Sequence, residues 1–192
     1  NRFLTYARIL DPQSKYGTWD RLDSYYEKPD IAYQHMIRFM DVLEEHYDDY
    51  LKWLFTQSSH IVPRSTAVMY YDCTNFYFET EQEDDDYVDP VTGEIMKGLR
   101  QYGVSKEHRS NPVVEMGLFM DQRGIPVSMS LHPGNTSEQL TAVPLERDIV
   151  HMLNGAKLIY CADAGLGSYN IRKFNSMGGR AFIVTQSIKK LS

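Results

Sequence analysis

The sequence is poor in the residues that support disulfide or zinc chemistry. It has only two cysteines, Cys73 and Cys161, in a chain of 192 residues. So few cysteines favour a reducing compartment, and we therefore expect a cytoplasmic protein. The six histidines form no His-x-x-x-His pair and the cysteines no Cys-x-x-Cys pair, so the usual zinc sites are not indicated. Both cysteines are interpreted as small strand residues rather than nucleophiles.

Long apolar runs and glycine-rich loops are also missing. No run approaches the ~18 apolar residues of a membrane-spanning helix, and no signal peptide is recognisable, so the sequence predicts no membrane association. The glycine-rich phosphate loop and the Gly-x-Ser-x-Gly elbow are absent, which argues against the enzyme classes that need them. Because the chain begins at Asn1 without an initiator Met and ends just after a strand-like run, we expect a piece of a longer protein.

The charge is unevenly distributed. A net charge of −6 argues mildly against nucleic-acid binding, because such binding usually relies on neutralising phosphates. Much of the negative charge lies in one short segment that contains Glu79, Glu81, Glu83, Asp84, Asp85, Asp86 and Asp89. This segment lacks the ligand spacing and the glycine of a calcium loop, so it is interpreted as a solvated loop.

The acidic segment opens a long polar stretch, residues 79–112, whose second half is basic. That half carries Lys97, Arg100, Lys106 and Arg109. A loop of this length inside a compact domain is usually functional or disordered. Only the basic half can approach phosphates, and salt pairing with the acidic half is an equally good interpretation.

The length allows one sizeable core with a small helical appendage. Residues 1–29 carry few signals and are predicted to be irregular. From Asp30 to about Ser59, apolar residues recur at three- and four-residue steps, which predicts one amphipathic helix. We therefore expect a helical N-terminal segment over residues 1–62 and a core over residues 63–192.

The core begins with the stretch 68–78, which is dense in β-branched and aromatic residues and is predicted to be a buried strand. Asp72 lies in the middle of this stretch. An ionised carboxylate in such a position costs several kcal/mol unless a cation or hydrogen-bond donors meet it. Asp72 is therefore interpreted as either well paired or functional.

A hairpin follows the polar stretch. Residues 113–120 and 125–131 are predicted strands, and the turn Asp121–Gly124 joins them with Gly124 at positive φ. Pro126 cannot donate to a strand ladder, which favours an edge position for the second strand.

The rest of the core alternates helices and strands. A helix is expected after a Thr136 cap, with a break or restart at Pro144, and a short helix over 169–177. Strands are expected over 157–162 and 181–185. This order predicts an α/β fold with a mixed sheet and flanking helices.

A second acid, Asp163, follows the strand 157–162 directly, and small residues come after it. Ligands of open α/β sheets bind outside the carboxyl ends of strands. If the strands of Asp72 and Asp163 are parallel neighbours, about 5 Å apart, the two carboxylates can share a divalent cation, for which oxygen ligands favour Mg²⁺ or Mn²⁺. Two acids on strands can equally be a structural pair or turn caps.

Several motifs resemble the DDE transposases of bacterial insertion sequences, in the insertion-sequence-four-like branch. They are Tyr70-Tyr71-Asp72-Cys73-Thr74-Asn75-Phe76-Tyr77-Phe78, Gly103-Val104-Ser105-Lys106-Glu107, Gly124-Ile125-Pro126, His132-Pro133-Gly134-Asn135-Thr136 and Ala162-Asp163-Ala164-Gly165. They occur in the order typical of the family and cover most of residues 65–190. The acidic segment 79–89 is a departure from the pattern.

The resemblance implies a ribonuclease H-like core and a DNA transposase that cuts and joins strands with two Mg²⁺ or Mn²⁺ ions. Asp72 matches the first catalytic acid and Asp163 the second, and both are expected to be metal ligands. The third acid, a glutamate on a later helix, and a β-rich insertion have no match before Ser192, so this chain is expected to be incomplete for catalysis. Residues 1–62 would be the end of a DNA-binding or linker region.

The resemblance also implies DNA partners, namely transposon ends and target, and a homodimer in the synaptic complex. DNA contacts are expected at Ser105, Lys106, Arg109, Asn135 and Thr136. Lys106 would position a phosphate, and the 134–136 turn would line the cleft. Asn135 and Thr136 are equally well explained as a turn and a helix cap.

Two other functions compete with the transposase. Asp72-x-Thr74 after a strand can serve as the nucleophile of a phosphatase, although that chemistry usually has a second acid where Thr74 stands. The other alternative is an inactive or truncated transposase that only binds DNA or dimerises.

Overall fold

The computed structural model describes residues 1–155 and 157–186, and the chain divides into two units, Asn1–Leu54 and Phe55–Ser192. The ribonuclease H-like core predicted over 63–192 therefore includes residues 156 and 187–192, which lie outside the described part. No helix in the described ranges is both long and apolar enough to cross a membrane.

The first unit is helical. It contains α1 (Arg2–Leu10), α2 (Lys15–Asp20), the 3₁₀ turn η1 (Leu22–Ser24) and α3 (Tyr33–Glu45), and α4 (Tyr47–Ile61) begins in it and ends in the second unit. The prediction that residues 1–29 are irregular was wrong. Ser14 caps α2 by accepting a hydrogen bond from Gly17 N, and the rings of Tyr16, Trp19 and Tyr33 pack together with centroids 5.6–5.9 Å apart.

The single long helix predicted from Asp30 was also wrong, because α3 and α4 are separate. His46 leaves the helical conformation at φ −109° and ψ 25°, while its N–H still bonds to Val42 O. The apolar repeat continues across His46 into α4, and for that reason the periodicity alone did not show the break.

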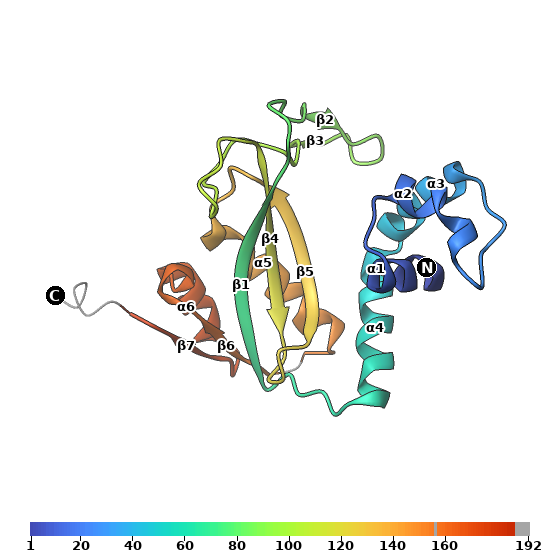
Figure 1. Ribbon diagram of the computed structural model, residues 1–192. Coiled ribbons are helices and arrows are strands. Elements are labelled where there is room, and N and C mark those ends of the chain that lie inside the picture. The colour runs from blue at the N-terminus through green and yellow to red at the C-terminus, as the bar shows by residue number, and fades with distance from the viewer. Residues whose placement is uncertain (156, 187–192) are drawn as a thin grey trace. The chain divides into compact units, whose positions relative to one another are not determined.

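The second unit is built on a mixed five-stranded sheet with the order β5-β4-β1-β6-β7 (Figure 1). Its strands are β1 (Val68–Tyr77), β4 (Val113–Met120), β5 (Pro126–Pro133), β6 (Ile159–Ala162) and β7 (Ala181–Val184). β5, β4 and β1 pair antiparallel, whereas β1, β6 and β7 pair parallel. This arrangement confirms the predicted ribonuclease H-like mixed sheet.

Helices complete the second unit. They are α5 (Glu138–Met152), which joins β5 to β6 across one face of the sheet, the 3₁₀ turn η2 (Ala164–Leu166) and α6 (Tyr169–Asn175) (Figure 1). A separate two-stranded sheet, β2 (Tyr87–Val88) with β3 (Ile95–Met96), lies within the long polar stretch. α6 lies between the parallel neighbours β6 and β7 in the chain, and such pairs require a crossover connection of this kind.

The core lies between α5 and the sheet face that carries Met69, Tyr71 and Cys73. Tyr71 packs on Phe119 at 4.6 Å between ring centroids, and its hydroxyl lies 2.6 Å from Thr141 Oγ1 on α5. The intervening residues of β1, Tyr70 and Asp72, are exposed. The expectation that Asp72 is buried was therefore wrong, since strand alternation turns it to the other face.

The predicted hairpin is confirmed, with Gly124 at φ 74° and Pro126 at the start of the edge strand β5. The predictions for α5 were wrong in detail. Ser137 rather than Thr136 occupies the N-cap, and the helix continues through Pro144, which is exposed. The buried stripe of α5 holds the helix against the sheet and outweighs the hydrogen bond that a proline removes.

Candidate functional site

Asp163 lies directly after the carboxyl end of β6, where it caps η2. Its Oδ1 accepts hydrogen bonds from Gly165 N at 3.0 Å and Leu166 N at 3.2 Å. A Cβ on Gly165 would stand 3.3 Å from the same oxygen, so the small residue keeps this turn open. The turn fixes the direction of the carboxylate, and Oδ2 makes no hydrogen bond within the described part of the chain.

The register of β1 and β6 runs toward Asp72 and Asp163. The paired residues run from Val68 and Ile159 to Tyr70 and Cys161. Continued for two residues past the last pair, the same register would set Asp72 opposite Asp163, and neighbouring strands lie about 4.8 Å apart. On this extension the two acids would occupy neighbouring positions just past the end of β6.

The Asp72 carboxylate turns toward the edge of β1 that faces β6. Ala67 O accepts from Ile159 N, so odd-numbered residues of β1 direct their backbone groups to that edge. Cys73 is one of these residues, and its N–H donates to Asp72 Oδ1 at 2.8 Å. Because β6 ends at Ala162, this part of the β1 edge is open to other groups.

The loop that contains Lys106 occupies the open edge. Asn75 Nδ2 donates to Val104 O at 2.9 Å, and Lys106 N donates to Asn75 Oδ1 at 3.3 Å. Lys106 Nζ donates to Cys73 O, the carbonyl next to Asp72. The same ammonium forms an ion pair with Glu138 Oε1 at 3.0 Å.

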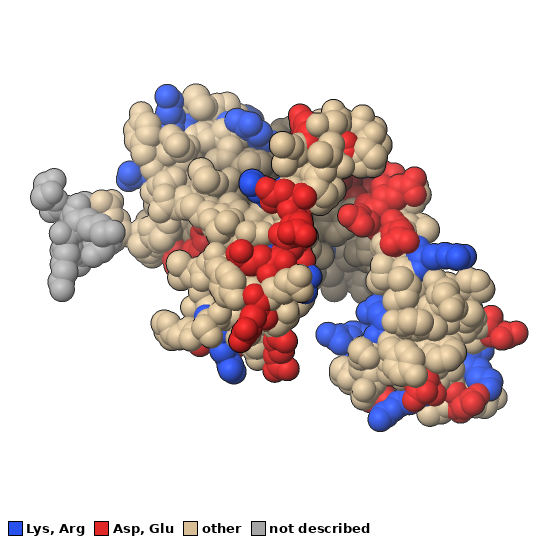
Figure 2. Space-filling view, turned by 90° about the horizontal axis from the view of Figure 1, so that it is seen from above, with Lys and Arg blue, Asp and Glu red and all other residues tan. Residues whose placement is uncertain are grey.

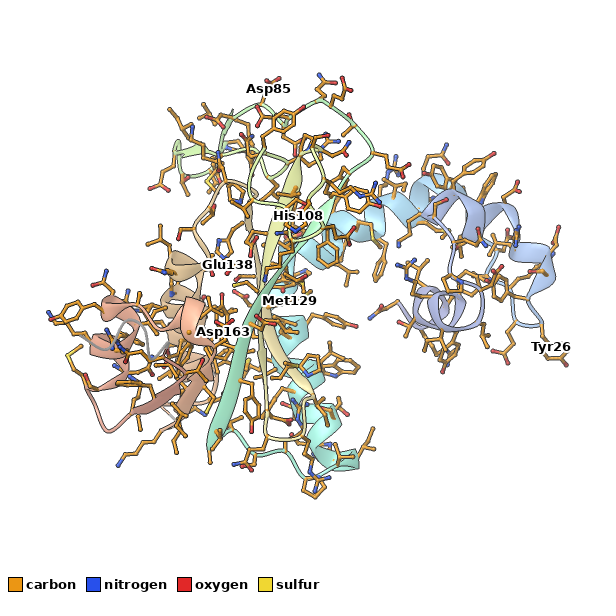
Figure 3. All side chains as sticks on the ribbon, turned by 60° about the vertical axis from the view of Figure 1, so that its left-hand side comes forward. Tyr26, Asp85, His108, Met129, Glu138 and Asp163 are labelled. Atoms are coloured by element: carbon orange, nitrogen blue, oxygen red, sulfur yellow. The ribbon has the colours of Figure 1, made fainter. Side chains whose placement is uncertain are left out.

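Glu138 was not singled out in the sequence, yet it belongs to this group. It is the first residue of α5, and the adjacent Gln139 Nε2 donates to Gly165 O in the turn after Asp163 at 3.2 Å. Figure 3 shows Glu138 and Asp163 on the same side of β1. Burial by itself lowers the pKa of Lys106. The hydrogen bond and charge of Glu138, together with the charge of Asp72, raise this pKa by a larger amount, so the net change is an increase.

Glu115 is a second acid that the sequence analysis missed. It lies on β4 opposite Asn75, is 3% exposed, and its Oε1 has no partner among the described residues. Burial, and then the charge of Glu138, raise the pKa of the Glu115 carboxyl. The sequence pattern that could have indicated Glu115 is a single acid between apolar strand residues, which is the same pattern that indicated Asp72.

The residues predicted to contact DNA are only partly brought together. A Cβ on Gly103 would lie 1.8 Å from Gly134 O, so the loop before Ser105 and Lys106 packs directly on the 134–136 turn. Within that turn Asn135 is exposed, and Thr136 N donates to Pro133 O at 2.8 Å. The turn explanation of Asn135 and Thr136 thus fits the geometry.

Ser105 and Arg109 have local roles. Ser105 is buried, and its Oγ accepts a hydrogen bond from Arg109 N at 3.1 Å. The Arg109 guanidinium lies over the Tyr77 ring at 4.9 Å and 3.9 Å from Glu107 Oε2. Nearby, Lys97 pairs with Asp86 and Arg100 with Asp84, so salt pairing, the alternative interpretation of the polar stretch, holds for these four residues.

The donor set of the site suits a hard cation only in part. Asp72 and Asp163 each use one carboxylate oxygen for backbone N–H groups and present the other, and such oxygens are ligands for Mg²⁺ or Mn²⁺. Within residues 1–155 and 157–186, no group of three or more His, Cys, Asp or Glu residues is arranged to hold a metal ion. These two acids therefore fit as two of the ligands of a divalent ion.

No family model and no curated protein sequence matches this chain. Among solved structures, it is similar to the Mos1 mariner paired-end complex with Mn (12% identity, TM-score 0.40), covering 96% of this chain and 58% of that one. It is also similar to the piggyBac transposase synaptic complex with hairpin DNA (13% identity, TM-score 0.45), covering 99% of this chain and 40% of that one. A Mos1 paired-end complex with Mg is similar at 13% identity and a TM-score of 0.34, with 92% and 56% covered. The chain thus spans less than two thirds of these transposases, and the insertion-sequence-four-like branch stays a prediction.

Proposed function

We propose that this chain is the part of a DNA transposase that carries the first two catalytic acids, Asp72 and Asp163. The observation that supports this most is the β1–β6 register, which would align Asp72 with Asp163 if it is continued for two residues past Tyr70 and Cys161. The mixed sheet supplies the ribonuclease H-like frame that the sequence motifs imply. The proposed reaction is hydrolysis at transposon ends followed by strand transfer into target DNA, within a homodimeric synaptic complex.

In this proposal Asp72 and Asp163 would hold the divalent ions. Bound there, Mg²⁺ or Mn²⁺ would supply activation of the attacking oxygen and stabilisation of the leaving oxygen of a phosphodiester. The protein's own part is to orient the carboxylates: the Cys73 N–H holds Asp72, and the N–H groups of Gly165 and Leu166 hold Asp163. Attack is in line, by water and then by the freed 3′-hydroxyl, without a covalent enzyme intermediate.

Lys106 supplies the positive charge of the site. Its ammonium is fixed between Glu138 and the Cys73 carbonyl, one residue from Asp72. From there it can balance the charge of the carboxylates or meet a phosphate oxygen of bound DNA. Glu138 keeps the lysine at the edge of β1 and so acts as a positioning residue.

Mn²⁺ binding tests this proposal. Isothermal titration of the chain should detect Mn²⁺ binding that Asp72→Asn and Asp163→Asn each abolish. Asp85→Asn is the matched control, because it removes the same charge from the exposed acidic segment, far from Asp163 in Figure 3. In a longer protein that nicks DNA, the same two variants should abolish nicking.

Other outcomes favour the competing functions. Metal-dependent cleavage that survives either substitution contradicts the assignment. DNA binding or dimerisation without any Mn²⁺ binding favours an inactive transposase, and a covalent phosphate trapped on Asp72 favours the phosphatase.

A further inference from the structure

The basic residues of the second unit divide into two groups. Five of them lie within salt-bridge distance of a carboxylate: Arg64, Lys97, Arg100, Lys106 and Arg109. Six others have no carboxylate within salt-bridge distance among the described residues, namely Arg123 in the hairpin turn and, from α5 onward, Arg147, Lys157, Arg172, Lys173 and Arg180. In a chain with a net charge of −6, five of these six cations therefore come from the part of the chain that begins with α5.

Two of these cations, Arg147 and Lys173, line a groove between α5 and α6, and Arg172 lines a hollow beside it. The groove has a volume of about 540 Å³ and is lined by Leu140 and Arg147 of α5 and by Tyr169 and Lys173 of α6. In Figure 2, the upper left of the view, on the side where Figure 1 places α6, shows blue atoms without red ones. The groove thus combines positive charge with apolar and aromatic walls.

The aromatic side chains of the groove are arranged for stacking. Tyr169 is 68% exposed, and Lys173 Nζ lies 6.0 Å from its ring centroid. The Phe174 ring lies beneath the guanidinium groups of Arg147 at 5.2 Å and Arg180 at 4.0 Å. Exposed aromatic rings beside cations are the usual means of binding single-stranded nucleic acid, because bases stack while phosphates meet the charges.

The groove leads to the acidic site. A smaller hollow of about 200 Å³ shares Gln139 and Ser168 with the groove and adds Arg172 and Ala164, the residue after Asp163. The positive path therefore ends next to the carboxylates. A DNA strand needs such a path, because the acids repel phosphate and Lys106 shares its single positive charge with Glu138.

We propose that the groove between α5 and α6 binds a single DNA strand and guides it to Asp163, with Arg172 and Lys173 on the phosphates and Tyr169 stacked on a base. The choice of DNA as the ligand rests on the proposed function. This surface differs from the one predicted from the motifs, which comprised Ser105, Lys106, Arg109, Asn135 and Thr136.

Fluorescence anisotropy of a labelled oligothymidine, with the full chain in EDTA, tests the proposal. Arg172→Gln/Lys173→Gln should weaken binding at low salt on the order of ten-fold, and it should reduce the slope of log K against log salt by about 1.4, since each single-strand phosphate contact contributes about 0.7. Tyr169→Ala should weaken binding on the order of ten-fold through lost stacking. Arg123→Gln/Lys97→Gln removes the same charge from outside the groove and should bind like the wild type.

Equal weakening by the two double variants, or no binding of the oligonucleotide by the wild type, would overturn the proposal. Sedimentation that shows a dimer dissociated by Arg172→Gln/Lys173→Gln, with DNA binding unchanged, would make the groove an interface between copies instead. EDTA removes any contribution of metal, so a failure here is separate from a failure of Asp72→Asn and Asp163→Asn to affect Mn²⁺ binding.

Discussion

The buried ion pair between Arg64 and Asp121 allows a prediction of stability. Its side chains are 3% and 0% exposed, and Arg64 Nε donates to Asp121 Oδ2. Asp121 Oδ1 accepts from Arg123 N at 2.9 Å and Ile125 N at 3.0 Å, so one carboxylate holds both the hairpin turn and the arginine. Asp121→Asn keeps an oxygen for the turn but leaves the buried guanidinium without its counter-charge.

Removing one partner of such a pair costs about 3–5 kcal/mol. At roughly 2–4 °C per kcal/mol for a chain of this size, Tm should fall by roughly 10 °C. Urea denaturation and thermal melting followed by circular dichroism measure both quantities. Arg64→Met/Asp121→Asn should be more stable than the sum of the single variants predicts, because the double variant leaves no unpaired charge.

The pKa of Asp121 determines how the stability changes with pH. Burial raises the pKa of the Asp121 carboxyl, but the hydrogen bonds from Ile125, Arg64 and Arg123 lower it more, for a net decrease. The stability that Asp121 contributes is therefore present above the usual aspartate pKa and is lost as the pH falls through the lower folded-state value. A loss below 1 kcal/mol for Asp121→Asn, with an unchanged acid limb, would refute this account of the pair.

Two further predictions concern stability. The first concerns Glu146, whose Oε2 accepts a hydrogen bond from Asn175 Nδ2 at 2.8 Å. Glu146 Oε1 and Asn175 Oδ1 each lack a partner within the described residues. Burial raises the pKa of the Glu146 carboxyl. A protonated Glu146 carries no buried negative charge, so its contribution to stability is present at low pH and is lost as the pH rises through the raised folded-state pKa. Glu146→Gln should remove this loss in urea titrations that extend above the usual glutamate pKa, and equal pH slopes would contradict the reasoning. Gly103→Ala should destabilise the chain by about 1–3 kcal/mol, because its Cβ meets the Gly134 carbonyl at 1.8 Å, and a thermal melt identical to that of the wild type would show that the two loops separate freely.

Local patterns predicted the sheet well. The turn at Asp121–Gly124 and the dense β-branched stretch around Asp72 are signals between adjacent residues, and the structure has both the hairpin and the strand. The position of Asp163 at a strand end also followed from its neighbours. The helices α1 and α2 were missed because packing in the first unit depends on aromatic contacts such as Tyr16 with Tyr33, which no local pattern shows.

The make-up of the candidate site was less predictable, because it depends on long-range contacts. Glu138 joins it through an ion pair with Lys106, 32 residues earlier in the chain. A sequence gives no sign of whether an acid in a strand faces the core, so the burial expected for Asp72 belongs instead to Glu115.

The central claim is that Asp72 and Asp163 hold the same divalent ion. Mn²⁺ titration of Asp72→Asn, Asp163→Asn and the double variant, each followed by electron paramagnetic resonance, measures this directly. If the acids share an ion, each single variant should lose it and the double variant should lose nothing more. Two independent losses that add in the double variant would contradict a shared site.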